Sequence, residues 1–199
     1  MVLGGADLTN AFVGSYSSTG TGTQAITGVG FTPDLVIATH IVNDPNTPGG
    51  FSTASMNISA FASPTLRGAL SFRDTDAANP TQSSSYQRSD KAVTGLSSGS
   101  DTINHEADLS SMDADGFTLN YTTNLGTAGF GYLALKGGKY DVRVETQKTS
   151  SGTKSTTGIG FTPTGLLLMG TNDTASTSIN TTQAKLSIGG SDGTTEGAV

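Results

Sequence analysis

The sequence has no cysteine and no tryptophan, and only 13% of its residues are charged. Without cysteine the chain forms no disulfide and offers no thiolate for catalysis or metal binding. No apolar run approaches the roughly 20 residues of a membrane-spanning helix. Only 10 Lys and Arg stand against 16 Asp and Glu, which gives a formal net charge of −6. Because an acidic chain with no basic cluster repels phosphate, we expect neither nucleic acid nor a membrane as a partner.

The residues that are abundant indicate an all-β fold. Gly, Ser, Thr, Asn and Asp are frequent beside a hydrophobic fraction of 34%. This composition is too apolar for an intrinsically disordered chain and too poor in helix-forming residues for a helical bundle. Strands joined by many tight turns satisfy both limits, so we predict an all-β protein.

One stretch of the chain occurs twice. Residues 27–33 read Thr-Gly-Val-Gly-Phe-Thr-Pro, and residues 157–163 repeat six of these seven residues, with Ile159 in the place of Val29. The offset of 130 residues, Thr157 against Thr27, is too long for a solenoid repeat and suits a small domain followed by its copy. The repetition therefore predicts a β-rich module used twice.

Each copy reads as a strand, a bulged corner and a second strand. Glycine inside a strand marks a bulge or a close backbone approach, and proline suits a strand edge or a turn. An apolar run follows each corner, from Leu35 in the first copy and from Leu166 in the second, as expected for a buried strand. The residues of this structural repeat motif are Gly28, Gly30, Phe31 and Pro33 in the first copy and Gly158, Gly160, Phe161 and Pro163 in the second.

These patterns predict two tandem antiparallel β-sandwich modules, the second incomplete. Residues 1–11 read as an N-terminal arm, 12–138 as the first module and 139–199 as the N-terminal half of the second. We match the late apolar segment 186–188 to residues 70–72 of the first module. Because a half-sandwich with open edges is not stable alone, either the chain continues past Val199 or a partner supplies the missing edge.

Within the first module we expect loops and strands in alternation. The Pro- and Gly-rich segment 43–50 and the polar segment 74–85 read as loops, and 51–61 as one short helix or an irregular strand. Alternation of apolar and polar residues predicts a half-buried strand at 117–121, entered from an Asp-Gly turn. The remaining predicted strands lie at 66–72, near Val93, near Ile103 and at 130–135.

No pattern of catalytic residues emerges, and we predict no enzyme activity and no cofactor. Residues 95–99 and 189–193 fit the Gly-x-Ser-x-Gly pattern of a nucleophile elbow, but neither is followed by the helix that an elbow requires. His40 and His105 are the only histidines, and a lone histidine is usually structural or solvated. Tyr16, Tyr86, Tyr121 and Tyr132 fit the flanks of a sandwich core better than a carbohydrate surface.

Acidic residues offer no convincing metal site. Asp113-Ala114-Asp115-Gly116 opens like a calcium loop but lacks the third oxygen donor and the later Glu, so we interpret it as a hairpin turn. Asp74 and Asp76 are equally weak candidates, and nothing marks a pair of carboxylates for glycoside hydrolysis.

Three stretches together, residues 26–36, 112–119 and 132–137, resemble a module common in structural proteins of tailed bacteriophages. The resemblance covers the beginning and end of the first module and the first half of the second, and residues 41–105 depart from it. It implies a non-enzymatic, jelly-roll-like β-sandwich on the virion exterior, and it transfers no catalytic residues.

The resemblance leads us to expect a virion structural protein of the capsid-decoration or auxiliary type. Its partners would be other virion proteins, and because virion fittings occupy symmetric sites we expect a homo-oligomer, with a trimer as the first choice. One alternative is a tail-fibre or receptor-binding adhesin whose loops 43–50 and 74–90 touch a host-surface glycan or protein. Another is a carbohydrate-binding module, although the acidic, Trp-free composition disfavours it.

Overall fold

The computed structural model describes residues 6–41, 53–75, 82–97, 100–171, 174, 176–181 and 184–199. All regular elements in these ranges are β-strands, and all paired neighbours run antiparallel. The prediction of an all-β, antiparallel chain is therefore confirmed.

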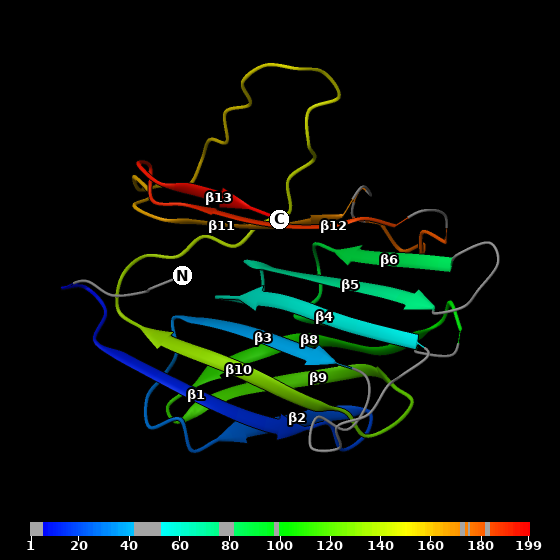
Figure 1. Ribbon diagram of the computed structural model, residues 1–199. Helices are drawn as coiled ribbons and strands as arrows, with labels where there is room; N and C mark the ends of the chain where they lie inside the picture. Colours follow the sequence, from blue (N-terminus) through cyan, green and yellow to red (C-terminus); the bar gives the residue numbers. More distant parts are fainter. Residues whose placement is uncertain are drawn as a thin grey trace.

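Ten strands form two facing sheets (Figure 1). The six-stranded sheet contains, in spatial order, β1 (Asn10–Ser17), β10 (Gly129–Lys136), β3 (Leu35–Ile41), β4 (Thr53–Phe61), β5 (Arg67–Thr75) and β6 (Gln82–Arg88). The four-stranded sheet contains β2 (Gly22–Thr27), β9 (Gly116–Asn124), β8 (Ile103–Asp113) and β7 (Val93–Leu96).

The core between these sheets follows from alternation along the strands. Phe117, Leu119 and Tyr121 point inward from β9 and are buried, as the sequence pattern predicts. The ring of Phe117 lies 5.5 Å from that of Phe61 and 5.3 Å from that of Tyr132, measured between centroids and in edge-to-face geometry. Such pairs add about 0.5–1.5 kcal/mol beyond area burial. Aromatic packing therefore joins the two sheets.

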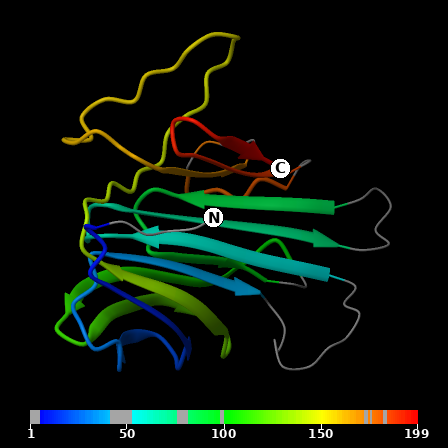
Figure 2. The same cartoon turned by 60° about the vertical axis from the view of Figure 1, so that its left-hand side comes forward.

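A third, smaller sheet is built from β11 (Leu166–Thr171), β12 (Leu186–Ser191) and β13 (Glu196–Ala198). Both ribbon views place it beside β5 and β6 (Figures 1 and 2). The connection to the first sandwich is a backbone bridge at the β6 edge, where the Ser85 amide donates to the Asn180 carbonyl and the reverse bond also forms, each at 2.9 Å. The connection between β11 and β12 thus pairs with the β6 edge of the larger sheet.

Several elements differ from the sequence prediction. Residues 53–61 form a regular strand rather than a short helix, and β6 begins at Gln82 inside the predicted loop 74–85. The strand near Ile103 runs for 11 residues to Asp113, because it pairs with β7 on one side and β9 on the other. Strand β1 begins at Asn10, within the predicted arm. The predicted loop 43–50 lies outside the described residues.

The second copy keeps the pairing of its middle strands. Leu166 pairs with Ser191, which is the register of Val36 and Phe61 displaced by 130 residues. Residues 186–188 therefore occupy the place of residues 56–58 in β4, and their match to residues 70–72 is wrong. Sequence similarity misled here because residues 70–72 and 186–188 share a Leu-Ser-apolar pattern, whereas register depends on the neighbouring strand.

The second copy does not form its first strands. Residues 139–165 contain no strand, although they include the counterparts of β1 and β2. In the first copy β1 pairs with β10 and β2 pairs with β9, and the described part of 139–199 contains no counterpart of either partner. A strand without a partner has no sheet hydrogen bonds to offset the entropy of ordering it. The segment near residue 150 accordingly projects away from the sheets in both ribbon views.

Gly116 in the β8–β9 turn provides a test of the turn geometry. Its φ is +145°, and a Cβ at this position would lie 2.0 Å from the carbonyl oxygen of Ile26. We expect Gly116→Ala to lower the free energy of unfolding by about 3 kcal/mol or more, because strain and backbone collision combine. Urea unfolding measures this, with Gly126→Ala as the matched control, since an added Cβ there meets nothing within 4 Å. Equal losses in the two variants would contradict the described turn.

Candidate assembly surface

The first copy of the repeated motif forms a corner that binds a carboxylate. Gly28 and Gly30 adopt φ values of +86° and +82°, which side-chain-bearing residues rarely adopt. Their amides donate to the carboxylate of Asp115 at 3.0 Å and 2.6 Å, and the amide of Val29 donates to the Asp115 carbonyl at 3.3 Å. The hydrogen bond from Gly30, followed by that from Gly28, lowers the pKa of Asp115. Asp115 thereby fastens the corner to the β8–β9 hairpin.

Apolar residues hold the same corner against the sandwich. Val29 and Pro33 are buried, and Phe31 is half-buried against the core. Asp34, just beyond the corner, accepts a hydrogen bond from the amide of Gly137 at 2.8 Å. The first corner is thus integrated into the module on both sides.

The second copy forms the same bend without such a partner. Gly158 and Gly160 have φ values of +77° and +79°. Among the described residues, none accepts a hydrogen bond from either amide. The guanidinium of Arg143 donates to the carbonyls of Thr157 at 2.9 Å and Gly158 at 3.3 Å. Phe161 is half-buried here, and Pro163 is exposed. The amide side of this corner is therefore open to solvent.

The third sheet exposes a face that is buried in the first module. Leu166 and Leu168 on β11 are 50% and 57% exposed, whereas their counterparts Val36 and Ala38 are 0% and 1% exposed. Strand β11 also lies at the edge of its sheet, while β3 is flanked by both β4 and β10. An open strand edge and an open apolar face thus occur on the same element.

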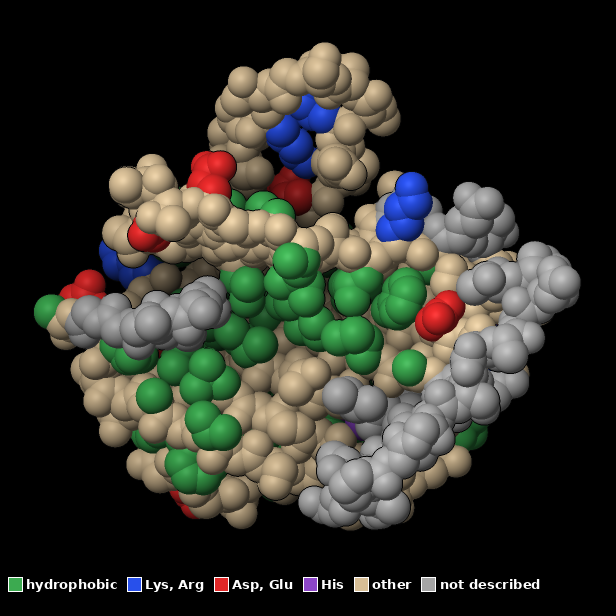
Figure 3. Space-filling model, viewed as in Figure 1, with side chains coloured by type: hydrophobic (Ala, Val, Ile, Leu, Met, Phe, Trp, Pro, Cys, Tyr) green, Lys and Arg blue, Asp and Glu red, His purple; other side chains and the backbone are tan. Residues whose placement is uncertain are grey.

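A second apolar area lies on the outer face of the six-stranded sheet. Figure 3 shows hydrophobic side chains gathered over β3, β4 and β5, next to the third sheet. Alternation and register assign this area to outward-facing residues that are half-buried or, for Leu70, buried: Ile37, Met56, Ile58, Leu70 and Phe72. The strandless segment 139–165 covers part of it, since Val144 lies against Gly68 on β5.

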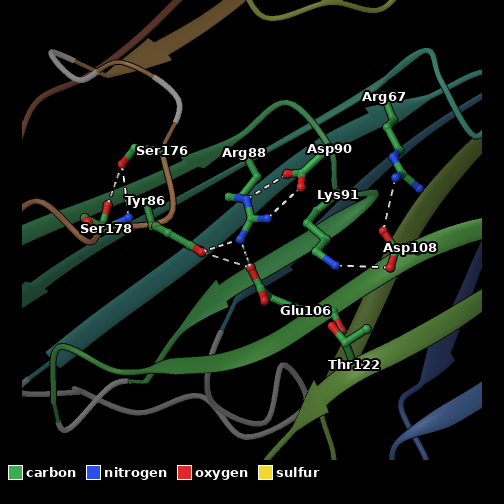
Figure 4. A network of polar contacts seen from close by, with 10 residues as sticks. All are labelled: Arg67, Tyr86, Arg88, Asp90, Lys91, Glu106, Asp108, Thr122, Ser176 and Ser178. Atoms are coloured by element: carbon green, nitrogen blue, oxygen red, sulfur yellow. Dashed lines mark hydrogen bonds and ion pairs between the residues drawn. The ribbon is translucent and has the colours of Figure 1, made fainter.

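A network of ion pairs closes the sandwich beside β6 (Figure 4). The Arg88 guanidinium donates to both carboxylate oxygens of Asp90 at 2.7 Å, to Glu106 at 2.8 Å and to the Tyr86 hydroxyl at 2.7 Å. Asp108 pairs with Arg67 at 3.2 Å and with Lys91 at 3.1 Å. Because Glu106 and Asp108 lie on β8 and their partners lie on or next to β5 and β6, the network joins the two sheets.

A shallow hollow of about 290 Å³ adjoins this network. Its lining is Arg88, Ser89, Asp90, Ser176 and Thr177. The charged groups that border it are already paired with each other, so the hollow offers no free charge for a ligand.

The residues considered for catalysis lie in the sandwich interior and at the ends of strands. His40 and His105 are buried, with ring centroids 5.5 Å apart, and Nε2 of His105 lies 2.9 Å from the Gly126 carbonyl. Of the two Gly-x-Ser-x-Gly stretches, the one at 95–99 begins in β7, and the one at 189–193 begins in β12 and ends in the turn before β13. Residues 98–99 lie outside the described part.

Asp113-Ala114-Asp115-Gly116 is the β8–β9 hairpin turn, as predicted. The Asp113 carboxylate accepts hydrogen bonds from Ser111 and Thr118, both at 2.7 Å. No cluster of His, Asp or Glu suited to a metal occurs within the described ranges, and Asp76 lies outside them. The sequence prediction missed that Asp115 binds the Gly28–Gly30 corner. The amides of Gly28 and Gly30 point out of the bend and need a hydrogen-bond acceptor. That need was the one feature of the sequence that could have indicated a carboxylate partner for the bend.

Comparison with known protein families, curated proteins and solved structures gives no significant match. Within the described residues, no helix is long and apolar enough to cross a membrane.

The buried histidines make stability depend on pH. Burial, and secondarily His105, lower the pKa of His40 to about 4, and burial also lowers the pKa of His105. Between the unfolded pKa of about 6.5 and the folded pKa, only the unfolded chain gains the proton, so the free energy of unfolding falls as the pH falls. For His40 this amounts to about 2–3 kcal/mol between pH 7 and pH 4.5.

His40→Phe removes this titration and keeps a ring against Phe130, which lies 4.6 Å from His40 between centroids. We expect urea unfolding at pH 7 and pH 4.5 to show a loss smaller by about 2–3 kcal/mol in the variant. The same pH dependence in both proteins would show that His40 is not buried in its neutral form.

Proposed function

We propose that this chain is a non-enzymatic bacteriophage virion structural protein of the capsid-decoration or auxiliary type, which acts by assembly onto the particle surface. The observation that carries the proposal is β11, which is the end strand of its sheet in the described part of the chain and also exposes the side chains of Leu166 and Leu168. A strand edge binds another polypeptide through main-chain hydrogen bonds, and the apolar side chains add burial energy.

The contact area of β11 alone would not hold a stable complex. Full burial of an exposed Leu side chain contributes about 1.5–3 kcal/mol, and these two are already half covered. Stable protein interfaces bury about 1,200–2,000 Å². The outward-facing apolar residues of β3, β4 and β5 are the adjoining surface that a particle protein would also cover.

The bacteriophage assignment rests on the resemblance of three sequence stretches, and their arrangement supports it. Asp115 of the second stretch binds Gly28 and Gly30 of the first. Gly137 of the third binds Asp34 of the first, and Leu135 pairs with Leu35. The three stretches therefore meet in space and form one structural unit, which explains why they occur together.

Two alternatives are less well supported. For the adhesin, residues 82–88 of the expected contact loop 74–90 form strand β6. For the carbohydrate-binding module, Tyr86, Tyr121 and Tyr132 are buried, so they are not available to stack on a sugar ring. Tyr16 is half-buried, and its hydroxyl lies 3.1 Å from that of Tyr121.

Electron microscopy of intact particles labelled with antibody to this chain tests the location. We expect label distributed over the head, whereas label at the tail tip would support the adhesin instead. A glycan array that yields a specific binder would support the carbohydrate-binding module.

Attachment also depends on β11 if the proposal is right. We expect the double variant Leu166→Glu and Leu168→Glu to lose attachment to particles in a co-sedimentation assay, because charge on this face opposes burial. The control is Val13→Glu, which places one added carboxylate at a 79% exposed position on β1. Attachment of the double variant at the control level would place the contact elsewhere.

A further inference from the structure

We infer that two histidines and an asparagine inside the first sandwich form a binding site for a single transition-metal cation of the Zn²⁺ type. The ligands would be Nδ1 of His105, a ring nitrogen of His40 and Oδ1 of Asn57. The role of the cation would be structural, because these residues lie in the interior and come from both sheets. The inference goes beyond the proposed function and does not depend on it.

Three strands bring these side chains together. His40 on β3 and Asn57 on β4 are directly paired in register, and both are buried. His105 lies on β8 of the opposite sheet, with its ring centroid 5.5 Å from that of His40. Nδ1 of His105 lies against strand β7, 3.6 Å from the position of a Cβ on Gly95. The Asn57 side chain reaches the same strand, because its Nδ2 donates to the carbonyl of Thr94.

The hydrogen bond of His105 determines which of its ring nitrogens can bind a cation. Nε2 lies 2.9 Å from the carbonyl oxygen of Gly126, which can only accept a hydrogen bond, so Nε2 carries the proton. Nδ1 then has a lone pair, and it is buried with no hydrogen-bond partner among the described residues. Histidines that bind metals commonly donate their other ring nitrogen to a carbonyl in this way. His105 therefore has the arrangement of a metal ligand.

The other two side chains also present lone pairs. Oδ1 of Asn57 is buried and has no hydrogen-bond partner in the described part of the chain. Burial lowers the pKa of His40, so its ring is neutral at pH 7 and one of its nitrogens has a lone pair. Ser55 and Ser59 flank Asn57 on the same face of β4, but their hydroxyls donate to backbone carbonyls. The lone pairs therefore need a cation or a further hydrogen-bond donor.

The ligand types and their spacing indicate a cation of the Zn²⁺ type. Imidazole suits Zn²⁺ and similar transition metals, whereas Mg²⁺ and Ca²⁺ prefer carboxylate and other oxygen ligands. Because Zn–N bonds are about 2.0–2.1 Å long, two imidazoles on one tetrahedral Zn²⁺ have ring centroids about 5 Å apart. The separation of 5.5 Å between His40 and His105 is close to this value.

Water would complete the coordination of the cation. No group of three or more His, Cys, Asp or Glu suited to a metal occurs among the residues that the structure describes, so this site has two imidazoles and one amide oxygen. Burial of a divalent charge among neutral ligands is costly. Water bound to Zn²⁺ has a pKa of about 7, so loss of its proton lowers the buried charge.

Zinc binding by the 199-residue chain without an affinity tag tests the inference. The chain has no cysteine and only two histidines, so imidazole or thiolate coordination can occur only at this site. We expect calorimetry to show a single Zn²⁺ per chain. Urea unfolding at pH 7 should show a higher midpoint with Zn²⁺ than with a chelator, because the folded state binds the ion. Mg²⁺ at the same concentration should leave the midpoint unchanged.

Variants of the ligands locate the site. His105→Gln and His40→Phe should each abolish the Zn²⁺-induced change in the urea midpoint, because one of the two imidazoles is lost. The matched control is Thr94→Val, which removes another buried oxygen that lacks a hydrogen-bond partner among the described residues. Since side chains alternate along β7 and Gly95 faces His105, Thr94 points away from the site. The Thr94→Val chain should keep the full Zn²⁺-induced change.

Ring nitrogen chemical shifts of the unchanged chain provide a second measurement if a variant does not fold. Zn²⁺ should move the resonances of Nδ1 of His105 and of the His40 ring. Resonances that stay in place at saturating Zn²⁺ would overturn the inference and would mean that a water molecule pairs with these atoms. Absence of binding would also overturn it. So would an unchanged Zn²⁺ effect in the two histidine variants, because surface carboxylates would then hold the ion.

Discussion

The pairing of backbone hydrogen-bonding groups is the constraint on which the rest of this structure depends. The two copies of the repeated motif have the same bends and similar flanking patterns, yet only the first has strands before its bend. The difference lies in the partner strands β9 and β10, which satisfy β1, β2 and β3 in the first copy. The sequence pattern allows these segments to form strands, but they form strands only where a neighbouring strand pairs with them.

The same constraint explains the polar interior at one end of the sandwich. Strand β7 is the edge of its sheet, and it lies over the inner face of β4 and β5. Ser55 donates to the carbonyl of Leu96 at 2.9 Å, Ser71 accepts from the amide of Leu96 at 2.9 Å, and Asn57 donates to the carbonyl of Thr94. Side chains of one sheet thus satisfy the edge of the other. A core of apolar residues alone would leave these backbone groups unpaired at a cost of about 1–3 kcal/mol each.

Much of the first module could be predicted from sequence because its strands show simple local patterns. Phe117, Leu119 and Tyr121 alternate with polar residues, and the Asp-Gly pair before them marks a turn. Strand β6 could not be predicted in this way, since Ser83, Ser84 and Ser85 give no apolar alternation and are held by β5 and by Asn180. The binding of Asp115 to Gly28 and Gly30 depends on contacts between residues more than 80 positions apart, which no local pattern encodes.

Amide hydrogen exchange on the isolated 199-residue chain tests most directly whether strand partners decide which segments are ordered. Residues 12–16 and 22–27 should exchange slowly, while their counterparts 142–146 and 152–157 should exchange at the rate of an unprotected chain. Slow exchange in both pairs of segments would show that the second copy forms its strands without β9 and β10, and would contradict the dependence on partner strands.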